Sequence, residues 1–407
     1  MKQFEVPVGY RSSLISAIKQ QRKELDKLKK DFTPTLLDLG KLKIYLARHF
    51  GFCYGVENAI EIAYKTIEEN KGKRIYLLSE MIHNPQVNTD LIQKGVQFLH
   101  DTLGNELIPL SSLTQEDIVI IPAFGTTLEM EQTLKSIGIQ IEKYNTTCPF
   151  VEKVWNRGEQ IAQKGYSIII HGKPKHEETR ATFSHAAANT ASVIVNDMEE
   201  TLKLIQIMTG ALPLNDFEKY FGNKCSKGFD PSKDLYKIGV INQTTQLATD
   251  TQAISDVLRN TMIQLHGIEN IQEHFADTRD TLCYATNDNQ SAVIGLLEVP
   301  GDLAIVMGGK NSSNSSHLVE LCENKLPTYF IDSAEKLLSA DQIQQTNWRN
   351  KETSLIPSYL PLDQETKILM TSGASCPDTV VEATIRKIAS FYQVENKLEK
   401  LVADWTR

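Results

Sequence analysis

The sequence predicts an α/β protein made of three similar α/β domains, each with a small parallel sheet. Apolar strand-like runs alternate with helical patterns along most of the 407 residues, which is typical of βαβ units. A cysteine stands at the start of a helical pattern three times, at Cys53, Cys148 and Cys283. An apolar run follows each cysteine after about 20 residues, which indicates one unit used three times. These runs cover residues 74–78, 166–170 and 303–307.

The repeat divides the chain into three domains with an extension at each end. We expect an N-terminal extension over 1–42, domains over 43–147, 148–282 and 283–392, a mid-chain insertion at about 208–237, and a charged tail over 393–407. In the extension Leu14, Ile18, Leu25 and Leu28 recur at helical spacing among many lysines. This pattern predicts a helix docked on the body with a basic outer face. The alternative is a docking surface for an acidic redox partner.

Polar loops follow the predicted strands. Strands are expected at 43–47, 74–78, 118–121, 140–144, 166–170, 238–241, 303–307 and 368–371, and helices through 60–67, 128–137, 150–155 and 380–385. In parallel α/β sheets, ligands bind beyond the carboxyl ends of the strands. The sequence therefore predicts one site where the loops of the three small sheets converge.

Composition excludes several classes of protein. The chain has 43 basic and 51 acidic residues, a formal net charge of −8, so we expect no nucleic-acid partner. No apolar run approaches the ~18 residues needed to cross a bilayer, and we expect no membrane contact. The six cysteines are sparse and form no C-x-x-C pair, unlike a secreted disulfide scaffold. We therefore expect a cytoplasmic protein.

The three repeated cysteines are candidate metal ligands. Three equivalent thiolates facing one point suit a [4Fe–4S] cluster with one open iron, and a helix N-terminus should lower a thiol pKa. Zinc is the rival, but structural zinc prefers closely spaced ligand pairs, whereas these cysteines lie 95 and 135 residues apart. The remaining cysteines are expected to be small buried hydrophobic residues, not ligands. They are Cys225, Cys322 and Cys376.

Two loops have the composition of an anion site. Residues 311–315 and 372–375 offer hydroxyl, amide and backbone N–H groups at helix starts, and His83 and His176 could add positive charge. The alternative is that such loops merely cap helices. Glu178 is a candidate acid, because a carboxyl group beside an anion has a raised pKa. Thr244 and Thr245 could donate to an alkoxide. No nucleotide-binding glycine motif is present.

Together these stretches resemble the 4-hydroxy-3-methylbut-2-enyl diphosphate reductase family. The resemblance spans about residues 43–390. The matching stretches are Gly51-Phe52-Cys53, His83-Asn84, Thr147-Cys148-Pro149, His176 to Glu178, Gln243-Thr244-Thr245, Cys283 to Thr286, Lys310 to Ser315 and Gly373-Ala374-Ser375.

The resemblance implies a trefoil of three α/β domains around a [4Fe–4S] cluster held by Cys53, Cys148 and Cys283. It implies reductive dehydroxylation of an allylic diphosphate to isopentenyl and dimethylallyl diphosphates, with Glu178 delivering protons and Thr244 near the allylic hydroxyl. It also implies ferredoxin or flavodoxin as the electron donor. The implied substrate-binding residues are His83, His176, Gln243, Ser312, Ser313, Asn314 and Ser375.

One departure from the family pattern is Phe124, which stands where many bacterial members have histidine. The replacement removes one potential diphosphate contact. Phe124, the extension and the insertion are similar to the plant and cyanobacterial branch. Two other classes of function stay open from the residues alone: a redox-neutral iron–sulfur hydro-lyase, and a non-enzymatic sensor that uses the same cluster.

Overall fold

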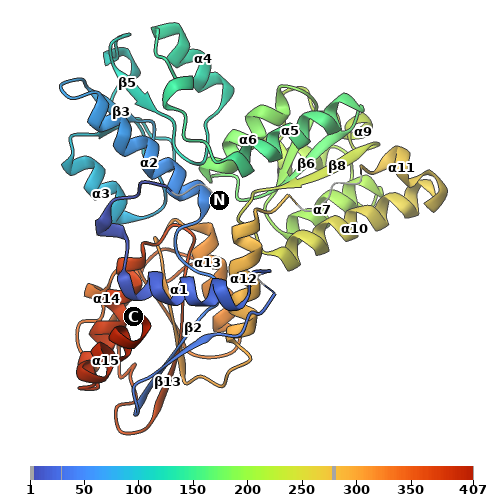
Figure 1. The fold of residues 1–407 in the computed structure, drawn as a ribbon. Helices are drawn as coiled ribbons and strands as arrows, with labels where there is room; N and C mark the ends of the chain where they lie inside the picture. Colours follow the sequence, from blue (N-terminus) through green and yellow to red (C-terminus); the bar gives the residue numbers. More distant parts are fainter. Residues whose placement is uncertain (1–3, 29, 277–280, 407) are drawn as a thin grey trace. The chain divides into compact units, whose positions relative to one another are not determined.

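The structure is a computed structural model that describes residues 4–28, 30–276 and 281–406 (Figure 1). The chain forms two compact units. The first comprises residues 1–61, 82–90 and 284–407, and the second comprises residues 62–81 and 91–283. Each unit is described by itself.

Three small parallel sheets confirm the predicted fold class. Each contains a set of three parallel strands in which the first strand in the chain is central, the second lies on one side and the third on the other, giving the order 2-1-3. The same order in all three sets confirms a threefold repeat of one supersecondary unit. Two sets are whole sheets, β4-β3-β5 (Gln97–Phe98, Ile75–Leu77, Ile118–Ile120) and β7-β6-β8 (Ser192–Val195, Ser167–His171, Ile238–Asn242), and the third, β10-β9-β13 (Thr328–Ile331, Leu303–Met307, Thr366–Ser372), is part of a five-stranded sheet.

The segment leading to each repeated cysteine lies beside the third strand of a sheet. β2 (Leu42–Leu46), which precedes Cys53, pairs in parallel with β13, as Figure 1 shows, and β1 (Thr35–Asp38) adds an antiparallel edge strand. The equivalents in the second unit are single parallel bridges, Asn145 with Ile121 and Phe275 with Ile238. The sequence predicted the strand before Cys53 but not its partner, because periodicity carries no information about pairing.

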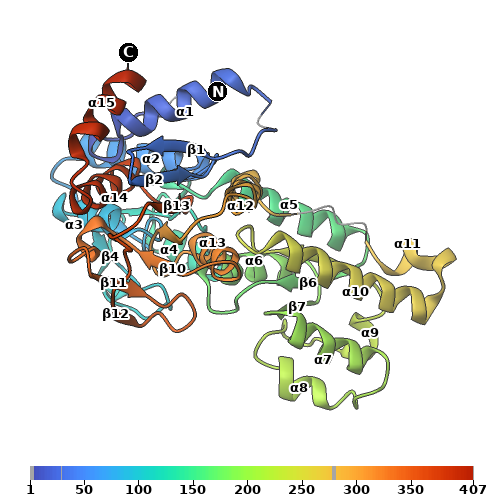
Figure 2. The ribbon, with the colours of Figure 1, turned by 90° about the horizontal axis from the view of Figure 1, so that it is seen from below.

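Helices cover these sheets in both units. In the second unit α7 and α10 lie side by side, as Figure 2 shows. The helices of the first unit are α1 (Ser13–Leu25), α12 (Tyr284–Leu296), α13 (Ser313–Glu323), α14 (Asp378–Phe391) and α15 (Glu395–Thr406). Those of the second are α4 (Leu128–Ile137), α5 (Pro149–Gln163), α6 (Glu177–Ala187), α7 (Met198–Met208), α8 (Asp216–Phe221), α9 (Pro231–Asp234), α10 (Ala248–His266) and α11 (Ile271–His274). Residues of both units belong to α2 (Tyr54–Glu69) and α3 (Pro85–Gln93).

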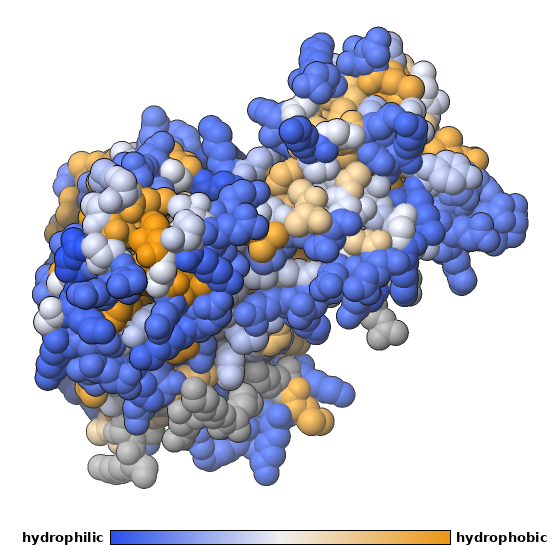
Figure 3. Space-filling model, turned by 90° about the horizontal axis from the view of Figure 1, so that it is seen from above, coloured by the Kyte–Doolittle hydropathy of each residue, from blue (hydrophilic) through white to orange (hydrophobic). Residues whose placement is uncertain are grey.

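The N-terminal extension is docked, as the sequence predicted. Leu14 and Ile18 of α1 join the core of the first unit, where α1 packs against α14 and α15. The buried stripe is shorter than expected, because Leu25 and Leu28 are 75% and 76% exposed. Figure 3 shows one face of the molecule, on which hydrophilic residues prevail and hydrophobic ones gather in small patches.

Several segments differ from the sequence prediction, and the strands β1, β4, β7 and β10 were not predicted. The strand expected at 140–144 is a 3-10 turn, Glu142–Tyr144, in which Tyr144 is buried. The expected charged tail forms α15, whose Leu398 packs into the core. The antiparallel hairpin β11–β12 (Gln342–Thr346, Thr353–Pro357) was not predicted, because its polar strands lack a clear apolar alternation. Among the described helices, none has the length and apolar character needed to cross a membrane.

Candidate active site

The three repeated cysteines are held by the same backbone contact. Each cysteine donates its N–H to a carbonyl in the loop after the third strand of a neighbouring sheet. The three bonds run from Cys53 to Ala374, from Cys148 to Ala123 and from Cys283 to Thr244, at 3.1, 3.0 and 3.2 Å. Equivalent backbone bonds show that the three cysteines hold equivalent positions in the repeat.

The three thiols do not all belong to the same unit. Cys53 belongs to the first unit, whereas Cys148 and Cys283 belong to the second, where their charges interact. Among residues 4–28, 30–276 and 281–406, no group of three or more His, Cys, Asp or Glu side chains is close enough together to hold a metal ion. The meeting of all three thiols on one cluster therefore stays a prediction. Within the described residues, which include all six cysteines, no disulfide is formed, and the three candidates are half-buried.

Burial controls the acidity of Cys148. The pKa of this thiol is raised to about 11, chiefly by burial and to a smaller extent by the nearby charges of Cys283 and Glu178. The backbone N–H groups of Phe150 and Val151, at the start of α5, lower the pKa but are outweighed. The helix N-terminus acts on the Cys148 pKa in the expected direction, but desolvation of the thiolate raises this pKa by more than the two N–H contacts lower it. A bound metal would have to displace this proton.

Glu178 and Thr244 are in direct contact. Glu178, on the first turn of α6, is buried, and its Oε1 accepts the Thr244 backbone N–H at 2.5 Å. The carbonyl of the same Thr244 accepts the Cys283 N–H. The backbone of this one residue thus links the candidate acid to a candidate metal ligand. The sequence predicted these three residues for one site, and the second unit brings them together.

His176 caps α6. Its Nδ1 accepts the Glu178 N–H at 3.2 Å, so this nitrogen carries no proton and a neutral ring has its proton on Nε2. In this arrangement His176 offers a hydrogen-bond donor where the sequence suggested a positive charge. Phe124 lies edge-on to this ring, with the centroids 5.7 Å apart, so the residue that replaces the usual histidine packs against His176.

Gln243 is fully buried, and its side chain is bonded on both ends. Its Oε1 accepts from the Lys173 backbone N–H, the Thr179 hydroxyl and the Gln246 amide, at 3.2, 3.0 and 3.0 Å. Its Nε2 donates to Thr245. These bonds connect the loop after β6 with the loop after β8. Its implied role in substrate binding stays a prediction, and the observed contacts are those of a residue that fixes two loops.

The loop after β9 leaves buried polar atoms without hydrogen-bond partners. Ser312 is the N-cap of α13, as the capping alternative predicted. The next two residues go beyond capping: the Ser313 Oγ and the Asn314 Nδ2 are buried and have no partner. Buried polar groups are rarely left unsatisfied, and two donors at a helix N-terminus favour an anion. The two buried donors of this turn in the first unit are therefore suited to an anion.

Two further predicted residues lie beside this turn. The Ser375 hydroxyl donates to the His83 carbonyl at 3.2 Å, and both residues are buried. A Cβ at Gly309 would overlap the same carbonyl, which explains glycine there. The first unit therefore brings together five predicted diphosphate ligands. These are His83, Ser312, Ser313, Asn314 and Ser375.

Two features of the site were not predicted. Asn289 of α12 donates to Asn314 Oδ1 at 3.3 Å, and the Ala374 N–H donates to the same oxygen at 2.9 Å. Nothing in the helical pattern of α12 distinguishes Asn289 from other polar positions. Cys376 is fully buried, which raises its thiol pKa to about 12, and its assignment as a non-ligand stays a prediction.

Known proteins resemble this chain over most of its length. The family model for LytB protein matches residues 44–389. A curated relative from Synechococcus sp. (strain WH7803), named 4-hydroxy-3-methylbut-2-enyl diphosphate reductase, is 38% identical over 94% of this chain and 90% of its own. Relatives with the same name from Picosynechococcus sp. and Synechocystis sp. are 40% and 37% identical, over 93% and 96% of this chain and 89% and 97% of their own.

Solved structures share the fold. The reductase of Plasmodium falciparum matches with a TM-score of 0.62 and 24% identity, over 86% of this chain and 89% of its own. A second structure, described as the terminal enzyme of the non-mevalonate pathway, matches with a TM-score of 0.51 and 23% identity, over 85% of this chain and 99% of its own. The matched family model and the cyanobacterial relatives establish that the chain belongs to the LytB protein family.

Proposed function

We propose that this protein is a 4-hydroxy-3-methylbut-2-enyl diphosphate reductase, the terminal enzyme of the non-mevalonate route to isoprenoids. The names of the curated relatives support the substrate. The observation that carries the proposal is the environment of the buried Glu178. Its carboxylate accepts the Thr244 N–H, and the Thr244 carbonyl accepts the Cys283 N–H. Glu178 also interacts electrostatically with Cys148. This arrangement sets a proton source beside two candidate cluster ligands, which is what a proton-coupled reduction needs.

The cofactor of the proposal is a [4Fe–4S] cluster held by Cys53, Cys148 and Cys283. Three thiols at equivalent repeat positions, outside any disulfide, fit a cluster with three protein ligands. When bound, such a cluster supplies electrons one at a time and an open iron that acts as a Lewis acid.

A serine scan tests this assignment. Replacing any of the three candidate cysteines by serine should remove most of the bound iron and sulfide, because serine is a poor ligand for iron–sulfur iron. Matched substitutions at Cys225, Cys322 and Cys376 should leave the iron content of the purified protein unchanged, apart from any loss of folding at the two buried positions. Equal iron loss in a well-folded Cys225→Ser protein would contradict the assignment.

The reaction of the proposal breaks the allylic C–O bond. Two electrons and two protons enter, the oxygen leaves as water, and the carbon skeleton becomes isopentenyl or dimethylallyl diphosphate. Glu178 would hold the proton that reaches the leaving oxygen, and Thr244 would orient the hydroxyl. The diphosphate would be bound by His83, His176, Ser312, Ser313, Asn314 and Ser375. We assign Gln243 to holding the loops that carry Thr244 and Thr245.

The electron donor and the compartment complete the proposal. A reaction that consumes low-potential electrons needs a carrier, and we propose ferredoxin or flavodoxin. The six cysteines, all of them in the described part of the chain, form no disulfide, which supports a reducing compartment such as the cytoplasm.

Anaerobic turnover tests the function. Purified protein with dithionite and a mediator dye should convert 4-hydroxy-3-methylbut-2-enyl diphosphate, and Glu178→Gln should lower kcat by about a hundredfold or more while keeping the cluster absorbance. The glutamine retains the bond from the Thr244 N–H, so a loss of activity would report on the proton and not on folding. Turnover without any electron donor would instead indicate a redox-neutral hydro-lyase.

A further inference from the structure

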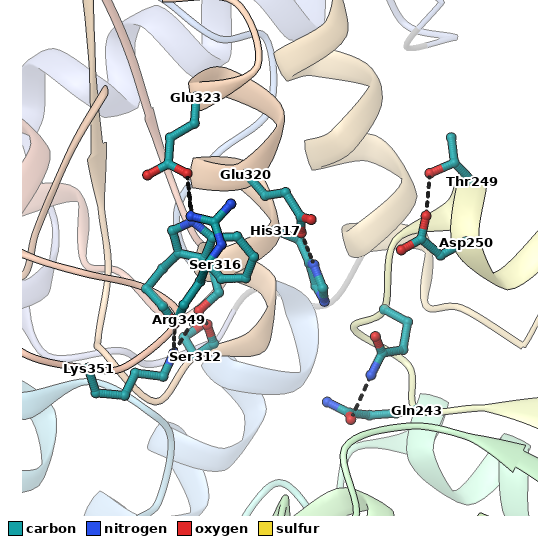
Figure 4. Close-up of polar contacts among 12 residues, drawn as sticks. Gln243, Thr249, Asp250, Ser312, Ser316, His317, Glu320, Glu323, Arg349 and Lys351 are labelled. Atoms are coloured by element: carbon teal, nitrogen blue, oxygen red, sulfur yellow. Dashed lines mark hydrogen bonds and ion pairs between the residues drawn. The ribbon is translucent and has the colours of Figure 1, made fainter. Parts of the chain in front are cut away.

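The hairpin β11–β12 carries a lysine onto the first turns of α13. The Lys351 ammonium donates to the Ser316 hydroxyl at 3.2 Å and to the Trp348 carbonyl at 2.5 Å (Figure 4). The Ser316 hydroxyl in turn donates to the Ser312 carbonyl at 2.9 Å. Lys351 is half-buried, and Ser316 is fully buried.

The tip of the hairpin is anchored so that Lys351 reaches this position. Lys351 has a positive φ of 64°, and its N–H bonds to the Asn347 carbonyl at 2.8 Å. At the other end of α13, Glu323 accepts from the Trp348 indole at 2.9 Å and from Arg349 at 3.0 Å, as Figure 4 shows in part. A lysine in the left-handed region is unfavourable unless its surroundings enforce it. The tip of the hairpin therefore forms hydrogen bonds with side chains near both ends of α13.

A cation at this end of a helix is electrostatically unfavourable. The N-terminus of a helix carries partial positive charge, which stabilises anions and repels cations. On a helix, side chains three and four residues apart are neighbours, so Ser316 lies over the turn that holds Ser312 and Ser313. The unpartnered Ser313 Oγ and Asn314 Nδ2 belong to the same turn. Lys351 thus adds positive charge where the helix terminus and two buried donors already favour an anion.

We propose that Lys351 is a positioning residue for the diphosphate. It acts through Ser316, by raising the positive potential at the N-terminus of α13 and holding that turn against the hairpin. This inference rests on the proposed function, because it takes the diphosphate group of the substrate as the anion. The repulsion in the ligand-free protein is offset when the anion binds, so Lys351 should favour the complex more than the free protein.

The test compares Lys351→Met with Lys351→Arg and with Lys336→Met in cluster-loaded protein under anaerobic conditions. Methionine keeps an unbranched chain but removes the charge, whereas arginine keeps the charge. Lys336 is a matched control, because its ammonium bonds to the neutral Gln344 amide at 3.0 Å and not to α13. Calorimetry with inorganic diphosphate at low and high salt gives Kd, and thermal unfolding with and without diphosphate gives Tm.

We expect Lys351→Met to weaken diphosphate binding by about tenfold at low salt and to reduce its salt dependence. The KM for the substrate should rise with little change in kcat. The ligand-free Tm should stay level or rise, and the Tm increase on adding diphosphate should shrink. Lys351→Arg should recover most of the affinity, and Lys336→Met should match the wild type.

Two results would overturn the inference. If Lys351→Met lowers the ligand-free Tm but binds diphosphate as the wild type does, Lys351 is only structural. If the wild type reduces the substrate and Lys351→Met does so with the same KM, the proposed function stands and the inference alone fails. A third result, a wild type that neither binds diphosphate nor turns over the substrate, would contradict both the proposed function and the inference about Lys351.

Discussion

Asn314 and Glu178 occupy the same position in two of the repeated units. One side chain ends in an amide and the other in a carboxyl group. Each is the second residue of the helix that follows a central strand. Each accepts a backbone N–H through a side-chain oxygen, Asn314 from Ala374 and Glu178 from Thr244. The carbonyl of that same Ala374 or Thr244 accepts the N–H of a repeated cysteine, Cys53 or Cys283.

The difference shows how one framework supports two tasks. In the first unit the amide uses its oxygen for the framework and leaves Nδ2 buried without a partner, so the position can donate to an anion. In the second unit a carboxyl group uses one oxygen for the same contact, and its other oxygen can carry a proton. The same backbone contacts recur around the cysteines of the two units. Under the proposed function, the amide at this position would bind the anion and the carboxyl group would deliver a proton.

Replacing the Asn314 amide by a carboxylate should have the largest effect. Asn314→Asp keeps the oxygen that accepts from Ala374 but replaces the unpartnered NH₂ by a second oxygen. We expect the KM for the diphosphate substrate to rise about a hundredfold, because a charge-assisted hydrogen bond becomes a repulsion. Ligand-free stability should change little, since a helix N-terminus tolerates a carboxylate. Steady-state kinetics and thermal unfolding would measure the two effects.

Asn324→Asp is the matched control. It makes the same charge change at the exposed C-cap of the same helix, away from the buried donors. Its KM should stay close to that of the wild type. A similar KM for Asn314→Asp and the wild type would mean that the partnerless amide does not contact the diphosphate, and the contrast with Glu178 would then be one of sequence alone.

The three equivalent units could be predicted from the sequence. The hydrogen bonds and strand pairings that connect their parts could be predicted only in part. The cysteine phase and the apolar runs indicated three equivalent units, and the order 2-1-3 of the three sets of parallel strands confirms them. Serine, asparagine and histidine at strand ends indicated the anion turn. The equivalence of Asn314 and Glu178 was not visible, because it depends on hydrogen bonds to Ala374 and Thr244 that no residue pattern encodes. The partner of β2 was missed because pairing depends on long-range packing.

Gln243 tests the second half of the comparison, and a smaller effect is expected there. In the second unit the loops are held by its buried side chain, whereas the first unit leaves donors for a ligand. Gln243→Leu would leave the Lys173 N–H and the Thr179 hydroxyl without this acceptor. We expect the free energy of unfolding to fall by about 2–4 kcal/mol, the cost of leaving buried donors unsatisfied. Denaturant unfolding of the purified protein measures it.

The control is Gln252→Leu on α10, whose amide bonds to Asp256 at an exposed position. It should change the free energy of unfolding by no more than about 0.5 kcal/mol. If Gln243→Leu were as stable as this control and raised only the KM, Gln243 would be a substrate ligand, as the family resemblance implies. Gln243 would then join His176 in presenting a group of the second unit to the diphosphate, and the contrast between an amide that fixes loops and an amide that binds the anion would no longer hold.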